Sequence, residues 1–273
     1  MNSNQQIKDK LTLITGASSG IGEQAALELS KRGTRVILIA RNSEKLMDLA
    51  EKIINAGGRA FPFSIDLSDY KQVIEITNKI KNEIGIPDII VNNAGAGIWK
   101  STEETEWEEI STCMTVPYFG AFYIVKAFLP EMMARKSGQI VNMTSYAGFI
   151  AFAGATAYIV SRKAMIGFHE ALTADLQGTG IICSLAYFAK VQSTYWTNNP
   201  GSEERLPGAQ VLVPVITPNQ AAKALVNGII NRRRKIFTPP VLVLFDYLIR
   251  FSPCIARLII YKTGYKRKAI NRA

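Results

Sequence analysis

The sequence predicts an α/β fold in which a doubly wound parallel sheet of about seven strands carries helices on both faces. Short apolar runs bounded by turn residues alternate with longer stretches of helical period, which is typical of βαβ units. Connections between parallel strands are right-handed, so repeated units wind helices onto both faces of one sheet. Ligands of such sheets bind at the carboxyl ends of the strands.

The individual elements follow from these patterns. Strands are expected at residues 11–15, 35–40, 59–64, 89–92, 139–144 and 181–187, and near Ile236. Helical patterns with Ser, Asp or Gly near their ends lie at 21–31, 44–55 and 69–84. Residues 195–218 have little periodicity and predict a long substrate-covering loop. We therefore expect a core of residues 1–238 and an extension of residues 239–273.

The composition excludes several classes of protein. Cys113, Cys183 and Cys254 lack the pair spacing of a disulfide framework or metal site, and His169 is the only histidine. A His-based metal site or a Ser-His-Asp triad therefore has too few ligands or bases. Residues 1–10 are polar, unlike a secretory signal peptide, so we expect a reduced, cytoplasmic protein.

A glycine-rich turn joins the first predicted strand to the first helix. It reads Thr15-Gly-Ala-Ser-Ser-Gly-Ile-Gly22. Glycines let the backbone approach a pyrophosphate, and the N–H groups that begin the helix favour that anion. The alternative is a glycine-rich turn without a ligand. The candidate cofactor-binding residues of this turn are Gly16, Ser18, Ser19, Gly20, Ile21 and Gly22.

The glycine spacing G-x-x-x-G-x-G resembles that of the short-chain dehydrogenase/reductase family, whose Rossmann-like domain binds a nicotinamide dinucleotide. The second strand ends at Ala40-Arg41-Asn42. A Rossmann unit that prefers NAD(H) places an acid here, whereas arginine can hold the 2′-phosphate of NADP(H). Arg41 therefore predicts NADP(H) as the cofactor, with a solvated surface arginine as the alternative.

Two further segments match the family in order and spacing. Asp66-Leu67 follows the third strand and corresponds to the family's adenine contact, and Asn93-Ala94-Gly95 follows the fourth strand. The resemblance implies that these five residues bind the cofactor. The alternatives are a helix cap for Asp66 and turn formation for the asparagine.

The catalytic residues are also assigned by resemblance. Ser145 ends the fifth strand, and Tyr158 follows it at the family's Ser–Tyr spacing. In the family the serine holds the substrate carbonyl, while the tyrosine passes a proton to its oxygen as nicotinamide delivers hydride. Tyrosine needs a nearby cation for this chemistry because its free pKa is about 10. The resemblance places Tyr158 and the cation against the cofactor as well.

Three departures from the family lie at this end. Arg162 stands where the family has lysine, and Lys163 follows it about 100° further round the helix. Pro117 replaces an asparagine. Phe188-Ala189 replaces a Pro-Gly pair after the sixth strand, although Val191 and Ser193 still resemble residues that frame the nicotinamide. Arg162 keeps the positive charge but does not deprotonate, so it relays protons poorly.

The last part of the chain, the extension together with the residues just before it, carries the whole net positive charge. Residues 231–273 contain eleven Lys and Arg against one acid, which accounts for the net charge of +10. An apolar run at 241–261 has Asp246, Arg250, Pro253 and Arg257 at helical spacing, as if in one polar stripe. These charges disfavour a spanning helix and favour one or two helices in a membrane interface, with basic flanks at 232–235 and 262–272.

Two alternatives accompany the membrane interpretation. The extension can instead be an arm that completes a dimer or covers the substrate pocket. Nucleic-acid binding is disfavoured, because an apolar stretch between the basic clusters has no part in it.

The sequence thus predicts an NADP(H)-dependent oxidoreductase acting on a hydrophobic carbonyl or alcohol, with Ser145, Tyr158 and Arg162 as catalytic residues and no metal. The rival hypothesis is an NADP(H)-binding sensor or scaffold whose altered proton relay no longer works. Family members are often dimers or tetramers, so the resemblance also implies a homo-oligomer.

Overall fold

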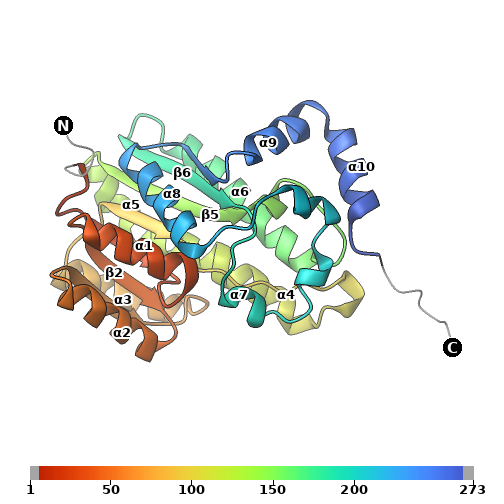
Figure 1. The fold of residues 1–273 in the computed structure, drawn as a ribbon. Helices are drawn as coiled ribbons and strands as arrows, with labels where there is room; N and C mark the ends of the chain where they lie inside the picture. Colours follow the sequence, from red (N-terminus) through yellow and green to blue (C-terminus); the bar gives the residue numbers. More distant parts are fainter. Residues whose placement is uncertain (1–5, 267–273) are drawn as a thin grey trace.

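A computed structural model describes residues 6–266, which form a seven-stranded sheet between two layers of helices (Figure 1). All strands are parallel, in the order β3-β2-β1-β4-β5-β6-β7. The strands are β1 (Leu11–Thr15), β2 (Arg35–Ala40), β3 (Arg59–Ser64), β4 (Ile89–Asn92), β5 (Gly138–Ser145), β6 (Ile181–Phe188) and β7 (Lys235–Thr238). The predicted fold class is confirmed.

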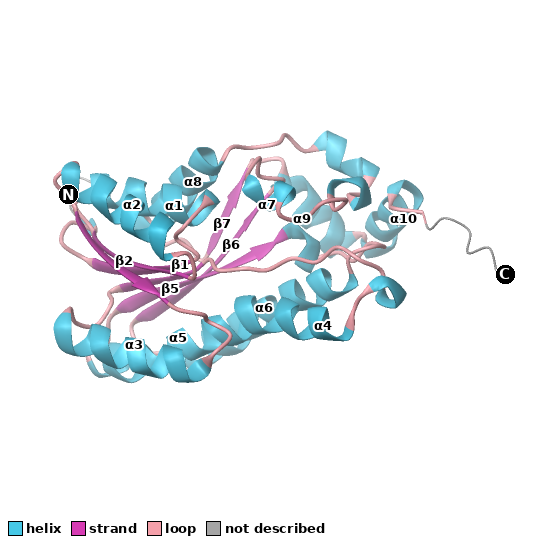
Figure 2. Cartoon of the chain, turned by 90° about the horizontal axis from the view of Figure 1, so that it is seen from below, coloured by secondary structure: helices cyan, strands magenta, loops and turns pink. Residues whose placement is uncertain are grey.

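Helices cover both faces of the sheet (Figure 2). One face carries α1 (Gly20–Lys31), α2 (Ser43–Asn55) and α8 (Pro218–Ile230). The other carries α3 (Tyr70–Glu83), α4 (Trp107–Met114), α5 (Gly120–Ala134) and α6 (Thr156–Asp175). The remaining helices are α7 (Thr194–Thr197), α9 (Leu242–Phe251) and α10 (Pro253–Thr263).

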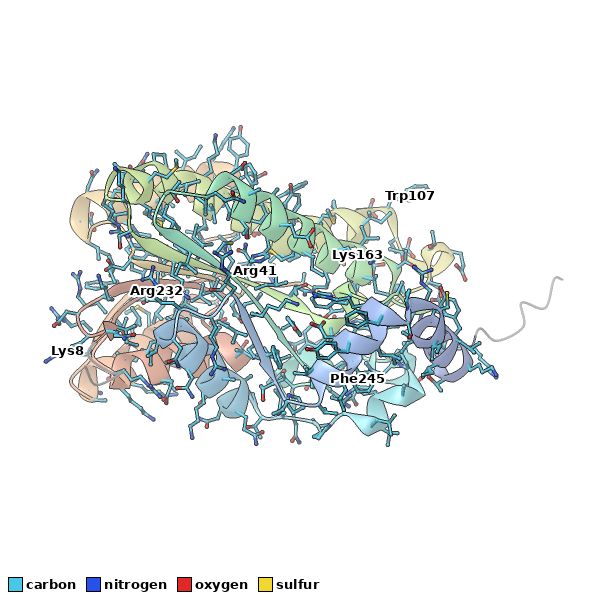
Figure 3. The ribbon with its side chains drawn as sticks, turned by 90° about the horizontal axis from the view of Figure 1, so that it is seen from above. Lys8, Arg41, Trp107, Lys163, Arg232 and Phe245 are labelled. Carbon is cyan, nitrogen blue, oxygen red and sulfur yellow. The ribbon has the colours of Figure 1, made fainter. Side chains whose placement is uncertain are left out.

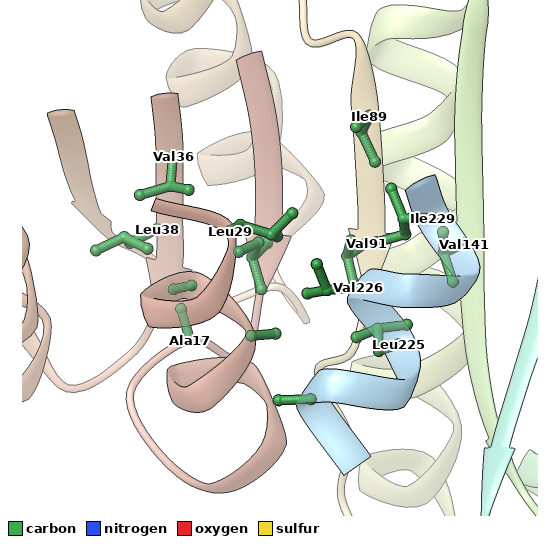
Figure 4. Packing of buried hydrophobic residues seen from close by; sticks show 14 of the residues in the cluster. Ala17, Leu29, Val36, Leu38, Ile89, Val91, Val141, Leu225, Val226 and Ile229 are labelled. Atoms are coloured by element: carbon green, nitrogen blue, oxygen red, sulfur yellow. The ribbon is translucent and has the colours of Figure 1, made fainter. Parts of the chain in front are cut away.

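The inner strands are buried on both sides, because successive side chains point to opposite faces of a sheet that helices cover on each face. In β1, Leu11 and Leu13 pack into the core beneath α3 and α5, whereas Ile14 packs against α1 and α8. Figure 4 shows this second core, with Leu29 of α1 and Leu225 of α8 over the sheet. Because both faces are buried, the strand sequences are continuously apolar and do not alternate between apolar and polar residues.

Local side-chain caps begin three of the helices. Asn42 accepts a hydrogen bond from Lys45 N at the start of α2, and Asp69 accepts one from Lys71 N at the start of α3. Thr217 forms a capping box with Gln220 at the start of α8. Each cap satisfies backbone N–H groups that have no partner within the helix.

Pro117 lies in a π-helical turn, Thr115–Phe119, that joins α4 to α5. Proline has no backbone N–H and its ring disturbs the preceding α-helical turn, which the wider π turn accommodates. The resulting continuous run, Trp107–Ala134, is the one stretch among the described residues that could cross a membrane by length and composition. Ile124 and Phe128 of this run are buried in the core, as in an ordinary core helix.

His169 has a partner that its sequence position did not suggest. Its Nδ1 lies 3.2 Å from the Sγ of Cys183 on β6. Burial lowers the pKa of His169 to about 4 and raises the pKa of Cys183 to about 11, so both groups are neutral at neutral pH. Neither lines the cavity described below, and the pair therefore has a packing role.

Candidate active site

A cavity of about 730 Å³ opens at the carboxyl ends of the strands, beside the segments that follow the neighbouring strands β1 and β4. This point, at which the strand order reverses, is where ligands bind in doubly wound sheets. With one exception, every residue predicted to bind cofactor or to act in catalysis lines this cavity. The exception is Gly22, which lies behind the glycine turn.

The glycine turn has the backbone geometry that only glycine adopts freely. Gly16 and Gly20 have φ values of +66° and +60°. A Cβ on Gly22 would lie 2.3 Å from the carbonyl oxygen of Gly16, so this glycine allows α1 to pack closely on the turn. Ser19, the N-cap residue of α1, makes no side-chain cap, which leaves the first N–H groups of the helix open to an anion.

Asn93 holds the glycine turn in place from the end of β4. Its side-chain Nδ2 donates to the carbonyl oxygens of Thr15 and Gly16, at 2.9 and 3.1 Å. The Thr15 hydroxyl in turn accepts from the backbone N–H groups of Asn93 and Ala94. The asparagine therefore organises the turn and lines the cavity at the same time.

Arg41 is exposed at the end of β2 and lines the cavity (Figure 3). Lys45 in the first turn of α2 lines the same region and is also exposed. Lys45 was not among the predicted site residues, although its position in the first turn of the helix after Arg41 could have indicated it. Asp66 lines the cavity nearby, and its Oδ1 accepts from Ser68 N. Asp69, rather than Asp66, caps α3.

Tyr158 and Arg162 lie one turn apart on α6, facing the end of β5. The Cζ of Arg162 is 4.7 Å from the centre of the Tyr158 ring, in a cation–π contact. Ser145 lines the same cavity and its hydroxyl accepts only from Ala147 N among the described residues. The structure therefore brings the three predicted catalytic residues into one cavity, while Lys163 is exposed on α6.

Arg162 is buried and tightly surrounded, with 8% of the residue exposed. Its Nη2 donates to the carbonyl oxygen of Ala96 at 3.0 Å, and its Nε has no protein partner among the described residues. A Cβ on Gly95 would lie 2.9 Å from Nη2, so the guanidinium needs a glycine at this position. Arg162 thus keeps a positive charge beside Tyr158 and an N–H group still able to donate.

An aromatic cluster that the sequence argument missed surrounds Tyr158. The Trp99 ring stacks on the Tyr158 ring, with centroids 4.8 Å apart and an interplanar angle of 28°. Phe152 and Trp196 contact Trp99 from other sides, and Tyr195 also packs within this cluster. No sequence spacing links these residues, because they come from the segments that follow β4, β5 and β6.

The predicted loop at 195–218 is held against the rest of the protein by ion pairs. It contains part of α7 and two short helical turns. Arg205 donates to both carboxylate oxygens of Glu104, which holds the pKa of Glu104 at about 2. Lys190 pairs with Glu203 at 2.7 Å. These ties hold the loop over the apolar end of the cavity, where Leu206 and Val213 line it.

The extension covers the same end of the cavity. Leu242, Phe245 and Ile260 from α9 and α10 are lining residues, and Figure 3 shows Phe245 at the end of the molecule opposite Lys8. The packing-arm alternative is therefore correct for the inward face of these helices.

The expected single polar stripe on the extension is wrong, because the helix breaks at Ser252 and the four residues lie on two separate helices. Asp246 faces the body, 3.1 Å from Lys235 Nζ and 3.5 Å from the Tyr187 hydroxyl. Arg250 and Arg257 are exposed instead. Arg272, at the end of the predicted basic flank, lies outside the described residues.

The chain belongs to the short chain dehydrogenase family, whose model matches residues 10–204. It is 34% identical over 238 residues to mouse 17-beta-hydroxysteroid dehydrogenase 13, covering 86% of this chain and 75% of that protein. It is 30% identical over 236 residues to the fatty acyl-CoA reductase of Acinetobacter baylyi, covering 86% and 77% of the two chains. A metagenomic short-chain oxidoreductase solved in complex with NADP superposes with a TM-score of 0.72 at 27% identity, covering 86% of this chain and 99% of that one.

Proposed function

We propose that this protein is an NADP(H)-dependent oxidoreductase that transfers hydride between nicotinamide and the carbonyl or alcohol carbon of a hydrophobic, lipid-like substrate. One observation carries the proposal. A single cavity has a glycine turn and Arg41 at one end, and Ser145, Tyr158 and Arg162 at the other. A dinucleotide in this cavity would place its phosphates at the helix start and its reactive ring at the hydroxyl groups.

The residues present fit the cofactor. The pyrophosphate would lie against the positive-φ glycines Gly16 and Gly20 and the uncapped start of α1. Arg41 and Lys45 would hold the 2′-phosphate, since both are exposed cations that line the cavity after β2, whereas Glu44 between them does not line it. Asp66 and Leu67 would border the adenine, and Val191 and Ser193 would frame the nicotinamide. When bound, the nicotinamide supplies or accepts the hydride.

The protein's own groups carry the rest of the reaction. Ser145 holds the substrate oxygen by a hydrogen bond, and Tyr158 gives a proton to that oxygen during reduction or takes one during oxidation. The guanidinium of Arg162 stands 4.7 Å from the Tyr158 ring and favours the negative charge that the ring bears after giving its proton. Burial of Tyr158 and Trp99 excludes water from this end of the cavity.

The lining of the catalytic end supports an apolar substrate. Trp99, Phe152, Leu206, Phe245 and Ile260 line the cavity beyond Tyr158. The names of two relatives, a hydroxysteroid dehydrogenase and a fatty acyl-CoA reductase, refer to substrates of this character. We therefore propose a long-chain or polycyclic carbonyl or alcohol, which such surfaces bind mainly by burial of apolar area.

The cofactor preference predicts a selective effect of replacing Arg41. Arg41→Ala should weaken NADPH binding about 10- to 100-fold, because a charge-assisted hydrogen bond to a phosphate contributes about 1.5–3 kcal/mol. NADH binding should change little, since NADH lacks the 2′-phosphate. Fluorescence titration of both nucleotides measures this, with Lys79→Ala on exposed α3 as a control for net charge. Equal losses for both nucleotides would contradict a 2′-phosphate role.

We also propose that the outward face of the extension rests on an anionic membrane. Ten of the twenty exposed large apolar side chains of the described residues lie at 211–261. On α9 these are Leu244, Tyr247 and Phe251, on the side away from the lining residues. The exposed charges of α9 and α10 are all basic, so two copies joined through this face would repel, whereas anionic headgroups would be attracted.

The helices are suited to lie in the interface rather than to cross it. With ten and eleven residues, α9 and α10 are each shorter than the roughly 20 residues that a membrane-spanning helix needs. A peripheral contact therefore remains the proposal, and the cytoplasmic location stays a prediction. A homo-oligomer stays a prediction from the family resemblance.

Removing two outward side chains should release the protein from vesicles. We expect Leu244→Ser with Phe251→Ser to weaken co-sedimentation with phosphatidylglycerol vesicles at least about tenfold, because each buried apolar side chain contributes about 1.5–3 kcal/mol. Met47→Ser with Ile54→Ser on α2 is the matched control, since these side chains are similarly exposed, at 57% and 54%. Binding that is equal for all three proteins would contradict the membrane proposal.

A further inference from the structure

Tyr195 is a second phenol at the catalytic end of the cavity. It lies on α7, directly after the residues that would frame the nicotinamide, and its ring centroid is 6.4 Å from that of Tyr158. Both side chains line the cavity and both contact Trp99. Two rings at this separation can direct their hydroxyl groups to one small-molecule oxygen.

The hydrogen bonding of Tyr195 leaves its own proton available. Trp99 Nε1 donates to the Tyr195 hydroxyl oxygen at 2.7 Å. An indole N–H can only donate, so the phenol oxygen is the acceptor and its O–H must point elsewhere. Among the described residues no acceptor receives it. Burial raises the pKa of Tyr195, so the group is a neutral hydroxyl at physiological pH.

The backbone around Tyr195 is shaped for this hydroxyl. A Cβ on Gly97 would lie 1.8 Å from the Tyr195 oxygen, so only glycine lets the phenol reach this position. In the same segment, the carbonyl oxygen of Ala96 accepts a hydrogen bond from Arg162. Trp99 lies in this segment too, and its ring stacks on that of Tyr158. Both phenols are thus positioned against one indole and one short segment of chain.

We propose that Tyr195 is a further catalytic residue, which donates its free O–H in a hydrogen bond to the substrate oxygen beside Ser145 and Tyr158. This inference rests on the proposed function. During reduction the bound nicotinamide would supply hydride to the carbonyl carbon, while Tyr158 gives its proton to the oxygen. Tyr195 keeps its proton throughout and stabilises the charge that develops on that oxygen. Trp99 is a positioning residue that fixes the direction of the Tyr195 hydroxyl.

The contribution of Tyr195 can be measured without turnover. The probe is a long-chain ketone, and tryptophan fluorescence measures its binding to the enzyme–NADP⁺ complex. In this complex no hydride can be transferred to the ketone. We expect Tyr195→Phe to weaken this binding about threefold to tenfold, as expected for one lost hydrogen bond. Binding of an alkane of the same length should be unchanged, because the ring remains and the alkane has no oxygen. Trp99→Phe should weaken ketone binding less, because the Tyr195 hydroxyl remains.

The same variant should lower kcat in NADPH-dependent ketone reduction more than it raises KM, since a developing negative charge on oxygen strengthens the hydrogen bond. Equal losses of ketone and alkane affinity would show that Tyr195 only fills space, and unchanged ketone affinity would also overturn the inference. If the unmodified enzyme binds ketone but does not reduce it, the proposed function fails while the ketone–alkane comparison still decides the role of Tyr195.

Discussion

Tyr158→Phe should abolish hydride transfer while leaving cofactor binding intact. The variant removes only the hydroxyl of a side chain that stacks on Trp99 and lies beside Arg162. Positioned acid–base groups contribute about 10²- to 10⁴-fold to rate, so we expect a loss of at least about 10²-fold in single-turnover oxidation of NADPH. The NADPH dissociation constant should change little, because phosphate and adenine contacts lie at the other end of the cavity.

The outcome for Tyr158→Phe distinguishes the enzyme hypothesis from the sensor or scaffold hypothesis. A rate that is unchanged by the substitution would contradict the proposed mechanism. If the unmodified protein binds NADPH but transfers no hydride, the sensor or scaffold hypothesis gains support. That hypothesis then predicts that Arg162→Lys combined with Pro117→Asn raises activity from near zero. No gain in that double variant would count against the idea that these two departures disable the relay.

Gly22→Ala should lower the affinity for both nucleotides. Its Cβ would lie 2.3 Å from the Gly16 carbonyl oxygen and 2.5 Å from the Asn93 side-chain nitrogen, so either α1 or the glycine turn must move. Overpacking of this kind costs about 1–3 kcal/mol, which corresponds to roughly a 10- to 100-fold weaker binding of NADPH and NADH alike. Fluorescence titration measures both affinities.

Gly167→Ala is the matched control for this substitution. Gly167 lies within α6, and a Cβ there would meet nothing within 4 Å. Alanine is favoured over glycine in a helix by about 0.5–1 kcal/mol, so this variant should melt slightly higher and bind NADPH normally. Thermal melting of Gly22→Ala shows whether the core remains folded. A folded Gly22→Ala protein with normal affinity would contradict the proposed packing of the turn.

Most of the fold could be predicted because each element has a local cause. The apolar strand runs and the caps at Asn42, Asp69 and Thr217 depend on neighbouring residues in the chain. The cavity lining around the glycine turn and Arg41 could be predicted equally well, since both directly follow strands. Gly22 shows the limit of that argument, because the sequence cannot tell a glycine that lines a cavity from one that permits packing behind it.

The apolar end of the site could not be predicted in the same way. Trp99, Phe152 and Tyr195 belong to three separate connections, and only the topology of the sheet brings them together. The division of the extension into an inward and an outward face likewise depends on tertiary contacts. Asp246 illustrates this, because its ion pair with Lys235 ties it to β7 of the body.

Single-turnover oxidation of enzyme-bound NADPH by long-chain aldehydes and ketones tests the central claim most directly. We expect the absorbance of the reduced nicotinamide to decay when an apolar carbonyl is added. In Tyr158→Phe we expect no such decay. Tight NADPH binding with no oxidation across a broad panel of apolar and polar carbonyls would contradict the assignment of this cavity as the active site of an oxidoreductase.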